Sequence, residues 1–263
     1  MKRSPMHMMF CGLVGGLALA GCNSVPASSP LRVGVTPDLP PVIAKAEGAI
    51  VGLEADFAKR LARELERPLE WVELKWEDQV PALLTGRIDL IMSGMSVTET
   101  RKVRIAFCEP YMTSGLMALT RRKDASQYKT RDGLLQSDDR VGVKKGTTAD
   151  TFAQEQFRNA YLVHYEIPND AALALKNRTL DIYLDDAPAI FWLASKYESD
   201  LTFSRVRLTE EDIAWGVSPN NSGLKEQVNQ ILAGWRKDGT LQRILERWVP
   251  VAPKEFKSGS SGN

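Results

Sequence analysis

The chain has 263 residues, of which 43% are hydrophobic and 25% are charged. This composition is typical of a folded globular protein and excludes a mostly disordered chain. Lysine and arginine total 34 against 33 aspartates and glutamates, so the formal net charge is +1. Because no excess of positive charge attracts the chain to polyanions, the sequence argues against nucleic acid as a partner.

The first residues are typical of an export signal. Lys2 and Arg3 precede an apolar run at residues 8–20 that is too short to span a bilayer. The run ends in "LAGC", residues 19–22, which resembles the lipobox of bacterial lipoproteins. We therefore predict a signal peptide at residues 1–21, lipidation of Cys22, and a polar tether at 22–30. The protein would then lie on the periplasmic side of the cell envelope, held to a membrane by its lipid alone. An ordinary signal peptide that happens to end before a cysteine is the alternative.

Few side chains are available for metal or nucleophile chemistry after this cleavage. Cys108 is the one remaining free cysteine and His164 the one remaining histidine. The single histidine argues against a histidine-based zinc site and weakens the case for a Ser-His-Asp triad. We expect Cys108, in "IAFCEPY", to be a small buried residue, and we predict no metal and no cofactor.

From residue 31 onward, the apolar pattern predicts alternating strands and helices. The first series is a strand at 31–35, a helix at 53–65, a strand at 69–73, a short helix in "EDQVPALLTG" and a strand in "IDLIMS". The second is an extended segment at 113–122, a strand and turn in "RVGVKKG", a helix from about 149, a strand in "LVHYE", a helix in "NDAALALKN", a strand in "LDIYL" and a helix at 187–197. The strand "IAWGV" at 213–217 and two helices over 222–248 follow. This alternation predicts an α/β fold with parallel sheets.

Two segments repeat one pattern. "PALLTGRIDLIMSGMS" and "LALKNRTLDIYLDDAP" each contain an apolar helix, an arginine-containing turn, an aspartate that opens an apolar strand, and small polar residues where the strand ends. Two occurrences suggest two similar lobes. Because parallel sheets bind ligands at the carboxyl ends of their strands, we expect "GMSVTETR", "GTTAD" and "DDAP" to face one cleft. Such a cleft suits a zwitterion.

These residues resemble family 3 of the bacterial extracellular solute-binding proteins, the polar amino-acid receptors of ABC importers. The likeness covers residues 31–249, in which "VGLEADFAKRLARELE", "VGVKKGTT", "LDIYLDDAP" and "LAGWRKDGTLQRILERW" keep the family's order and spacing. It implies a two-lobed periplasmic binding protein fold of type II, with two doubly wound α/β sheets joined by a two-strand hinge. Lobe 1 would comprise residues 31–118 and 216–250, lobe 2 residues 119–215, and a flexible tail residues 251–263. The chain would cross between lobes near residues 118–121 and 213–216.

The resemblance also implies roles for individual residues. Arg101 would bind the α-carboxylate of the ligand, and Asp186 would pair with its α-ammonium. Trp76 would lie over the ligand side chain. The supporting contacts would come from Ser96, Gly94, Thr147 and the backbone N–H of Thr148.

Without the resemblance, the same residues have structural interpretations. Arg101 would point into solvent from a helix capped by Thr98, and Thr147 and Asp186 would be plain helix caps. Trp76 would be a core residue. Lys144 and Lys145 are predicted to be a solvated pair.

The stretch "TPDLPPV" departs from the family pattern. It lacks the second aromatic residue that the family has near Leu39 or Val42, and Thr36 stands where relatives with cationic ligands often have aspartate. Neither a two-ring sandwich nor strong selectivity for lysine or arginine is therefore expected. Asp38, Asp185 and Lys144 are the candidates for setting side-chain polarity.

The resemblance implies a monomeric, lipid-anchored receptor, not an enzyme, that closes on an amino acid or a close derivative and delivers it to an ABC permease in the inner membrane. Two alternatives use the same fold. One is a sensory or accessory lipoprotein without an importer. The other is a dehydratase of arogenate or prephenate, with Glu54, Asp38 or Asp185 as proton donor.

Overall fold

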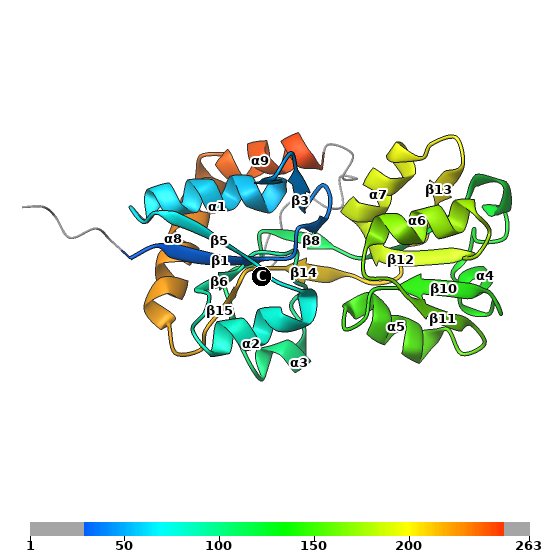
Figure 1. Cartoon of the computed structure of the whole chain (residues 1–263), viewed down its shortest axis with the longest axis horizontal. Coiled ribbons are helices and arrows are strands. Elements are labelled where there is room, and N and C mark those ends of the chain that lie inside the picture. Colours follow the sequence, from blue (N-terminus) through cyan, green and yellow to red (C-terminus); the bar gives the residue numbers. More distant parts are fainter. Residues whose placement is uncertain (1–28, 250–263) are drawn as a thin grey trace, which may run out of the picture.

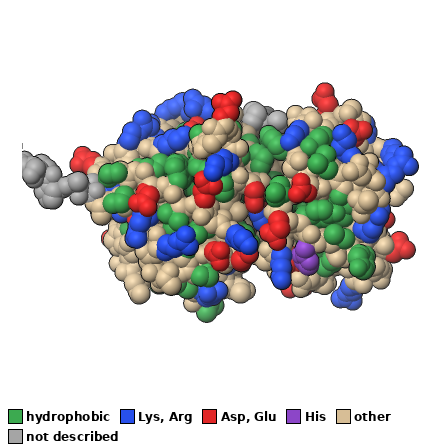
Figure 2. Space-filling model, viewed as in Figure 1, with side chains coloured by type: hydrophobic (Ala, Val, Ile, Leu, Met, Phe, Trp, Pro, Cys, Tyr) green, Lys and Arg blue, Asp and Glu red, His purple; other side chains and the backbone are tan. Residues whose placement is uncertain are grey.

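The computed structural model describes residues 29–249, which form two lobes side by side (Figure 1). Each lobe is built around one five-stranded sheet. The predicted signal peptide, Cys22, most of the tether and the tail at 251–263 lie outside the described residues. Charged side chains of both signs gather where the two lobes meet (Figure 2). Within residues 29–249, no helix has both the length and the apolar character that a membrane span requires.

The first lobe contains the sheet β5-β1-β6-β15-β7, in which β1 pairs in parallel with β5 and β6. Its strands are β1 (Leu31–Val35), β5 (Leu69–Glu73), β6 (Leu90–Ile91), β7 (Ala106–Phe107) and β15 (Gly216–Val217). Its helices are α1 (Leu53–Glu64), the 3-10 turn η1 (Trp76–Asp78), α2 (Gln79–Leu84), α3 (Glu99–Lys102), α8 (Ser222–Lys237) and α9 (Thr240–Trp248). A small sheet of β2 (Asp38–Leu39), β3 (Ile43–Ala46) and β4 (Ala49–Val51) contacts α1.

The second lobe contains the sheet β11-β10-β12-β9-β13, in which β10 pairs in parallel with β11 and β12. Its strands are β9 (Leu116–Arg121), β10 (Arg140–Val143), β11 (Tyr161–His164), β12 (Ile182–Asp186) and β13 (Leu201–Phe203). Its helices are η2 (Arg122–Asp124), α4 (Arg131–Leu135), α5 (Thr148–Gln156), α6 (Pro168–Lys176) and α7 (Ala187–Lys196).

Two strands connect the lobes. β8 (Met112–Ser114) pairs antiparallel with β14 (Glu211–Ile213), with Met112 opposite Ile213 and Ser114 opposite Glu211. The first crossing therefore lies before the expected residues 118–121, since β9 already pairs with β12 and β13 in the second sheet from Leu116 onward. The expected lobe boundary after residue 118 falls inside β9.

The predicted strand "IAWGV" is also interrupted. Its first residue, Ile213, ends β14, and β15 begins only at Gly216. Between them, the Trp215 ring packs at 5.6 Å from the rings of both Phe57 and Tyr111 and at 6.3 Å from that of Trp235. This large ring is buried in the core of the first lobe, at the point where the chain passes from the hinge strand β14 to β15.

The amphipathic spacing of its residues explains why α1 forms where the sequence predicted a helix. α1 buries Leu53, Phe57 and Leu61 against the first sheet, while Lys59 and Arg63 are exposed. The predicted strands at 31–35 and 69–73 are confirmed as well. Cys108 is buried, as expected, and burial raises the pKa of its thiol to about 12. The strands β2, β3 and β4 were not predicted from the sequence.

Candidate functional site

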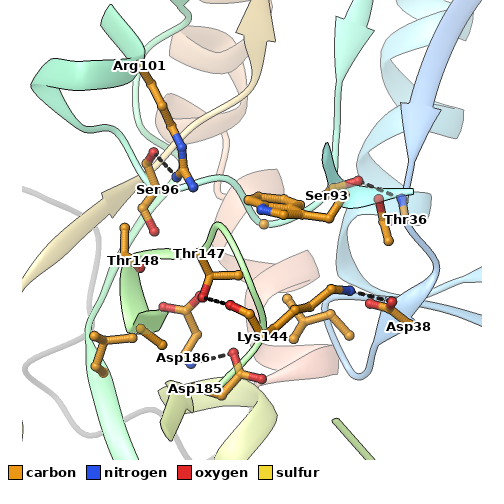
Figure 3. A pocket seen from close by; sticks show the side chains of 15 residues that line it. Thr36, Asp38, Ser93, Ser96, Arg101, Lys144, Thr147, Thr148, Asp185 and Asp186 are labelled. Carbon is orange, nitrogen blue, oxygen red and sulfur yellow. Dashed lines mark hydrogen bonds and ion pairs between the residues drawn. The ribbon is translucent and has the colours of Figure 1, made fainter. Parts of the chain in front are cut away.

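One cavity lies between the lobes, where the loops after β1, β6 and β10 and the end of β12 come together (Figure 3). It encloses about 480 Å³ of empty space, including the part open to solvent. All ten residues predicted to bind a ligand line it: Thr36, Leu39, Trp76, Gly94, Ser96, Arg101, Thr147, Thr148, Asp185 and Asp186. The strand-end rule and the family resemblance thus named residues that meet in one cavity, and the roles of these residues toward a ligand remain predictions.

Arg101 points into the cavity from the first lobe (Figure 3). Thr98 caps α3 by accepting a hydrogen bond from the Arg101 N–H at 3.2 Å, so this part of the structural interpretation is correct. The side chain, however, does not extend into solvent. Its Nη1 donates to the Ser96 carbonyl at 2.8 Å, and its guanidinium carbon lies 5.2 Å from the centroid of the Trp76 ring. The guanidinium has five N–H groups, and the Ser96 carbonyl accepts from at most two of them. The other N–H groups can therefore donate to another acceptor.

Arg101 is held in an environment that is costly for a charge. Burial lowers the pKa of its guanidinium from the usual value, and the nearby carboxylates of Asp186 and Glu211 oppose this effect. Because a guanidinium stays protonated even when buried, the cavity contains a fixed positive charge.

Asp186 faces the same cavity from the second lobe (Figure 3). It occupies the N-cap position of α7, but its side chain makes no capping hydrogen bond, so its interpretation as a plain cap is wrong. Its Oδ1 is buried and has no hydrogen-bond partner within residues 29–249. Burial raises the pKa of Asp186 well above its ordinary range, the carboxylates of Asp185 and Glu211 raise it further, and Arg101 opposes them. An unpartnered carboxylate oxygen in this environment is suited to a positively charged hydrogen-bond donor.

The neighbouring Asp185 is already bonded within the protein. Its Oδ2 accepts a hydrogen bond from the Tyr183 hydroxyl at 2.6 Å, and its Oδ1 accepts one from the Asp186 N–H at 2.8 Å. Burial raises the pKa of Asp185 to about 6. These bonds indicate that Asp185 orients the end of β12 beside the cavity.

The prediction that Lys144 and Lys145 form a solvated pair is wrong for Lys144. Its side chain is only 11% exposed, and its Nζ lies 2.5 Å from Oδ2 of Asp38 in the first lobe (Figure 3). Lys145, by contrast, is exposed as expected. Burial raises the pKa of Asp38, and the Lys144 charge opposes the rise. The ion pair crosses the cleft and places a second positive charge in the cavity wall.

Trp76 also makes a contact across the cleft. Its Nε1 donates to the Gly146 carbonyl at 3.0 Å. The ring packs partly against the core cluster of its own lobe, so the core interpretation and the cavity interpretation each hold for one side of the ring. Together with the Lys144–Asp38 pair, this bond holds the lobes in a closed arrangement.

The turn before α5 uses the Thr147 hydroxyl internally. This hydroxyl accepts a hydrogen bond from the Asp150 N–H at 3.3 Å and donates to the Lys144 carbonyl at 2.7 Å. The helix-cap interpretation is therefore correct for the hydroxyl. α5 begins at Thr148, and the N–H groups of a first helical turn have no acceptor within the helix. The backbone at Thr148 is thus better suited to bind an anion than the Thr147 side chain is.

The loop after β6 is supported from behind by a buried carboxylate. Glu54 is 0% exposed, and its Oε2 accepts a hydrogen bond from the Gly94 N–H at 3.0 Å. Gly94 has φ of 66°, and a Cβ there would lie 3.2 Å from Leu39 Cδ2, so only glycine fits without strain. Glu54 also accepts a hydrogen bond from the Tyr111 hydroxyl at 2.6 Å. Because Glu54 lies behind the loop and not in the cavity wall, it cannot be the proton donor that the dehydratase alternative assigned to it.

The hydrogen bonds of Glu54 predict a large effect on stability. Replacing Glu54 with leucine is expected to lower the free energy of unfolding by about 2–4 kcal/mol, because it leaves two buried donors without an acceptor. Glutamine should cost less than about 1 kcal/mol, since its amide can accept from Gly94 and donate to the Tyr111 oxygen. Urea unfolding of both variants measures the difference, and equal stabilities would contradict the assigned support role.

The charge of Glu54 adds a pH dependence. Burial raises the pKa of Glu54 to about 7. The folded state therefore binds the Glu54 proton more tightly than the unfolded state does. The contribution of Glu54 to the free energy of unfolding falls as the pH rises from the ordinary carboxyl range to about 7. The glutamine variant should lose this part of the pH dependence.

The loop after β6 is also joined to the hinge. Ser96 forms a bridge with Ile213, and the Val97 N–H donates to the Asp212 carbonyl at 2.8 Å. Both partners belong to β14. A displacement of the loop that carries Ser96 is therefore transmitted directly to a hinge strand.

Five further residues line the cavity: Asp38, Ser93, Leu116, Lys144 and Ala149. Of these, Asp38 and Lys144 were predicted only as candidates for setting side-chain polarity. Ser93 and Ala149 are next to predicted residues, and the rule that ligands bind at strand ends could have included them. The Ser93 hydroxyl accepts a hydrogen bond from the Thr36 N–H at 2.8 Å, which joins two of the converging loops. Within the part of the chain that the structure describes, no cluster of three or more histidine, cysteine or acidic side chains could hold a metal ion.

Sequence comparison identifies relatives over nearly the whole described chain. The profile of the bacterial extracellular solute-binding proteins, family 3, matches residues 31–251. ABC transporter arginine-binding protein 1 of Escherichia coli K12 is 29% identical over 231 residues, which cover 85% of this chain and 92% of the relative. The L-cystine-binding protein TcyJ of the same organism is 26% identical over 254 residues, covering 94% and 95%. These relatives are binding proteins.

Solved structures with the same fold agree. The ancestral amino acid-binding protein AncCDT-1, a precursor of cyclohexadienyl dehydratase, superposes with a TM-score of 0.78 at 31% identity and covers 84% of this chain and 95% of its own. A putative binding component of an ABC transporter from Wolinella succinogenes DSM 1740, complexed with lysine, has a TM-score of 0.80 at 27% identity and covers 86% and 97%. The two-lobed type II fold expected from the sequence is confirmed. The chain belongs to family 3 of the bacterial extracellular solute-binding proteins.

Proposed function

We propose that the protein captures a zwitterionic amino acid, or a close derivative, between its lobes and delivers it to an ABC importer. One observation carries the proposal: the fixed cation Arg101 and Asp186, whose Oδ1 has no hydrogen-bond partner within residues 29–249, face one cavity from opposite lobes. A guanidinium can hold a carboxylate with two parallel bonds, and each charge-assisted bond contributes about 1.5–3 kcal/mol. The naming of two relatives as arginine- and cystine-binding proteins supports an amino acid as ligand.

Such a ligand would couple binding to closure. Its carboxylate would bind the first lobe and its ammonium the second, so both contacts form only when the lobes are close together. The hinge of β8 and β14 allows the lobes to separate, and the bond between Val97 and Asp212 connects the Ser96 loop to it. The ligand would therefore stabilise the closed arrangement by its differential affinity for it.

We also propose that the mature protein is a monomer attached to a membrane through a lipid on Cys22. The sequence "LAGC" at residues 19–22 supports this attachment. An anchored receptor on the periplasmic side of the envelope stays close to a permease in the inner membrane, which suits capture followed by delivery.

A screen by thermal shift tests the proposed function. A ligand present at one hundred times its dissociation constant stabilises the native state by about 2.7 kcal/mol, which a melting curve resolves easily. We expect at least one α-amino acid or derivative, in a panel of L- and D-amino acids and opines, to raise the Tm. A panel in which no compound raises the Tm would contradict the proposal.

The cavity further suggests which side chains are accepted. Asp38, the acid that could attract a cationic side chain, is already neutralised by Lys144 at 2.5 Å. Because the two charges of the Lys144–Asp38 pair offset each other, the pair offers a cationic ligand side chain no net attraction. We therefore propose that the ligand side chain is uncharged, in contrast to the arginine or lysine named for several relatives.

Replacing Lys144 with methionine should change this selectivity. The variant removes the Lys144 charge and leaves the Asp38 carboxylate unbalanced, so arginine and lysine should bind at least tenfold more tightly than they bind the natural protein, about 1.4 kcal/mol. Titration calorimetry with both amino acids measures the change. Lys145→Met removes a charge from the adjacent, exposed position and should leave the selectivity unchanged. Equal behaviour of the two variants would contradict the role assigned to Lys144.

A further inference from the structure

A second charged feature lies on the first lobe, away from the cleft. It is a groove between α1 and α9 that encloses about 720 Å³, including the part open to solvent. We call it the α1–α9 groove. Lysine and arginine side chains gather over these two helices at the upper left of Figure 2. Five of the eight lining residues are basic and one, Asp56, is acidic; the basic residues are Lys59, Arg60, Arg63, Arg243 and Arg247.

Nearby acids cancel only part of this charge. Arg60 pairs with Glu64 at 2.9 Å and Arg247 with Asp56 at 3.2 Å. The remaining three cations, Lys59, Arg63 and Arg243, are exposed and make no ion pair within residues 29–249. The groove therefore offers three side-chain cations outside ion pairs on two adjacent helices, and of these Arg243 lies near enough to the Asp238 carboxylate to help lower the pKa of that group.

The groove's own hydrogen bonds leave these cations available. Arg243 donates to the Asp238 carbonyl at 3.1 Å and to the Thr240 hydroxyl at 2.8 Å, both of which are neutral acceptors. Lys59 has only a long contact of 3.5 Å with the Ile50 carbonyl. Guanidinium and ammonium groups of this kind bind phosphate oxygens, arginine with two parallel bonds.

The start of the described chain lies beside the same helix. Arg67, three residues after the end of α1, donates to the Ser29 carbonyl at 2.9 Å and to the Pro30 carbonyl at 2.7 Å. Cys22 precedes Ser29 by seven residues, which span at most about 25 Å when fully extended. If Cys22 carries a lipid, as proposed above, the end of α1 is held within that distance of the membrane surface.

We propose that the α1–α9 groove docks on the phosphate groups of anionic phospholipids, so that the first lobe is oriented against the membrane that holds the lipid anchor. Each basic side chain near an anionic surface strengthens partitioning about fivefold, and the effect fades within a Debye length. The groove is not required for attachment. It selects which face of the anchored protein lies toward the bilayer.

The test uses the full chain with Cys22→Ser, to which no lipid can be attached, so that its outcome does not depend on the proposed anchor. Cosedimentation is measured with vesicles of phosphatidylglycerol and phosphatidylcholine and with vesicles of phosphatidylcholine alone, at low and high salt. The groove variant carries Lys59→Gln, Arg63→Gln and Arg243→Gln. We expect it to bind the anionic vesicles at least tenfold more weakly at low salt, and to bind neutral vesicles like the unsubstituted chain.

The chain offers a matched control in another basic groove, on the second lobe, lined by Arg122, Lys123 and Arg178 among others. None of these three makes an ion pair in the described part of the chain, so Arg122→Gln, Lys123→Gln and Arg178→Gln remove the same charge. This control should bind anionic vesicles within about twofold of the unsubstituted chain, since the first lobe alone would contact the lipid.

Two results would overturn the proposal. The groove variant could bind anionic vesicles as tightly as the unsubstituted chain, or the control could lose as much binding as the groove variant. Loss of transport with unchanged vesicle binding would instead assign the groove to a protein partner. The thermal shift produced by an amino-acid ligand should persist in both variants, which separates failure of this proposal from failure of the proposed function.

Discussion

Replacing Arg101 with alanine is expected to weaken ligand binding by about 2–5 kcal/mol, the cost of deleting one partner of a buried charge pair. The reason is that the guanidinium is the fixed cation at the carboxylate end of the proposed ligand, held by the Ser96 carbonyl at 2.8 Å and by the Trp76 ring. Titration calorimetry with the amino acid identified by thermal shift measures the loss.

Two further variants distinguish the effect of the planar geometry of the Arg101 side chain from the effect of its charge. Arg101→Lys keeps the positive charge but cannot form the planar fork, so we expect it to recover only part of the affinity. Arg104→Ala removes an exposed arginine three residues away and should bind like the natural protein. Unchanged affinity in Arg101→Ala would show that the ligand carboxylate binds elsewhere.

Replacing Asp186 with asparagine is expected to act in opposite directions on binding and on stability. The ligand ammonium loses its carboxylate partner, at a cost of about 2–5 kcal/mol in affinity. The ligand-free protein should become more stable, by about 1 kcal/mol or 2–4 °C in Tm. Burial and two neighbouring carboxylates disfavour a negative charge at this position, and asparagine carries none. Melting curves with and without ligand measure both effects. The exposed Asp138→Asn should change neither.

The raised pKa of Asp186 also predicts how binding depends on pH. In the ligand-free protein, burial favours the protonated carboxyl, and the ligand ammonium favours the carboxylate. Binding should therefore release a proton, and affinity should fall as the pH is lowered through the pKa of the free Asp186. Calorimetry in buffers of different ionisation enthalpy counts the released protons. Asp186→Asn should abolish this release, and a release that persists in the variant would assign the proton to another group.

The same group contributes a pH dependence of stability with a definite sign. The folded pKa of Asp186 lies above its ordinary value, so the folded state binds the proton more tightly than the unfolded state does. Its contribution to stability is therefore greatest at low pH and decreases as the pH rises from the ordinary carboxyl range toward the raised pKa. Glu54 and Asp185, with pKa raised to about 7 and about 6, act in the same direction.

Local patterns predicted the elements that have one face in a core. α1 and the strands β1 and β5 were found because apolar residues recur at helical or strand spacing within one short segment. The same reasoning joined β8 to β9 and β14 to β15, because a continuous apolar run does not indicate where a strand leaves one sheet for another. The break at Trp215 depends on Phe57, Tyr111 and Trp235, which are distant in sequence.

The site was predictable to the extent that its residues follow strands. Gly94, Ser96, Thr147 and Asp186 come at or shortly after strand ends, so the fold brings them to one edge. The placement of Lys144 was not predictable, since its partner Asp38 is 106 residues away and no local pattern joins them. Glu54 was misplaced for a similar reason. Its position in the first turn of α1 does not indicate that it reaches the Gly94 loop.

We propose that Arg101 and Asp186 hold the two charged ends of one α-amino acid. The most direct measurement is titration calorimetry of the bound amino acid beside two analogues, one without its carboxylate and one without its ammonium. We expect each analogue to bind the natural protein at least a hundredfold more weakly. We also expect that Arg101→Ala no longer distinguishes the amino acid from the analogue without the carboxylate. Equal affinities of the natural protein for the three compounds would contradict the proposal.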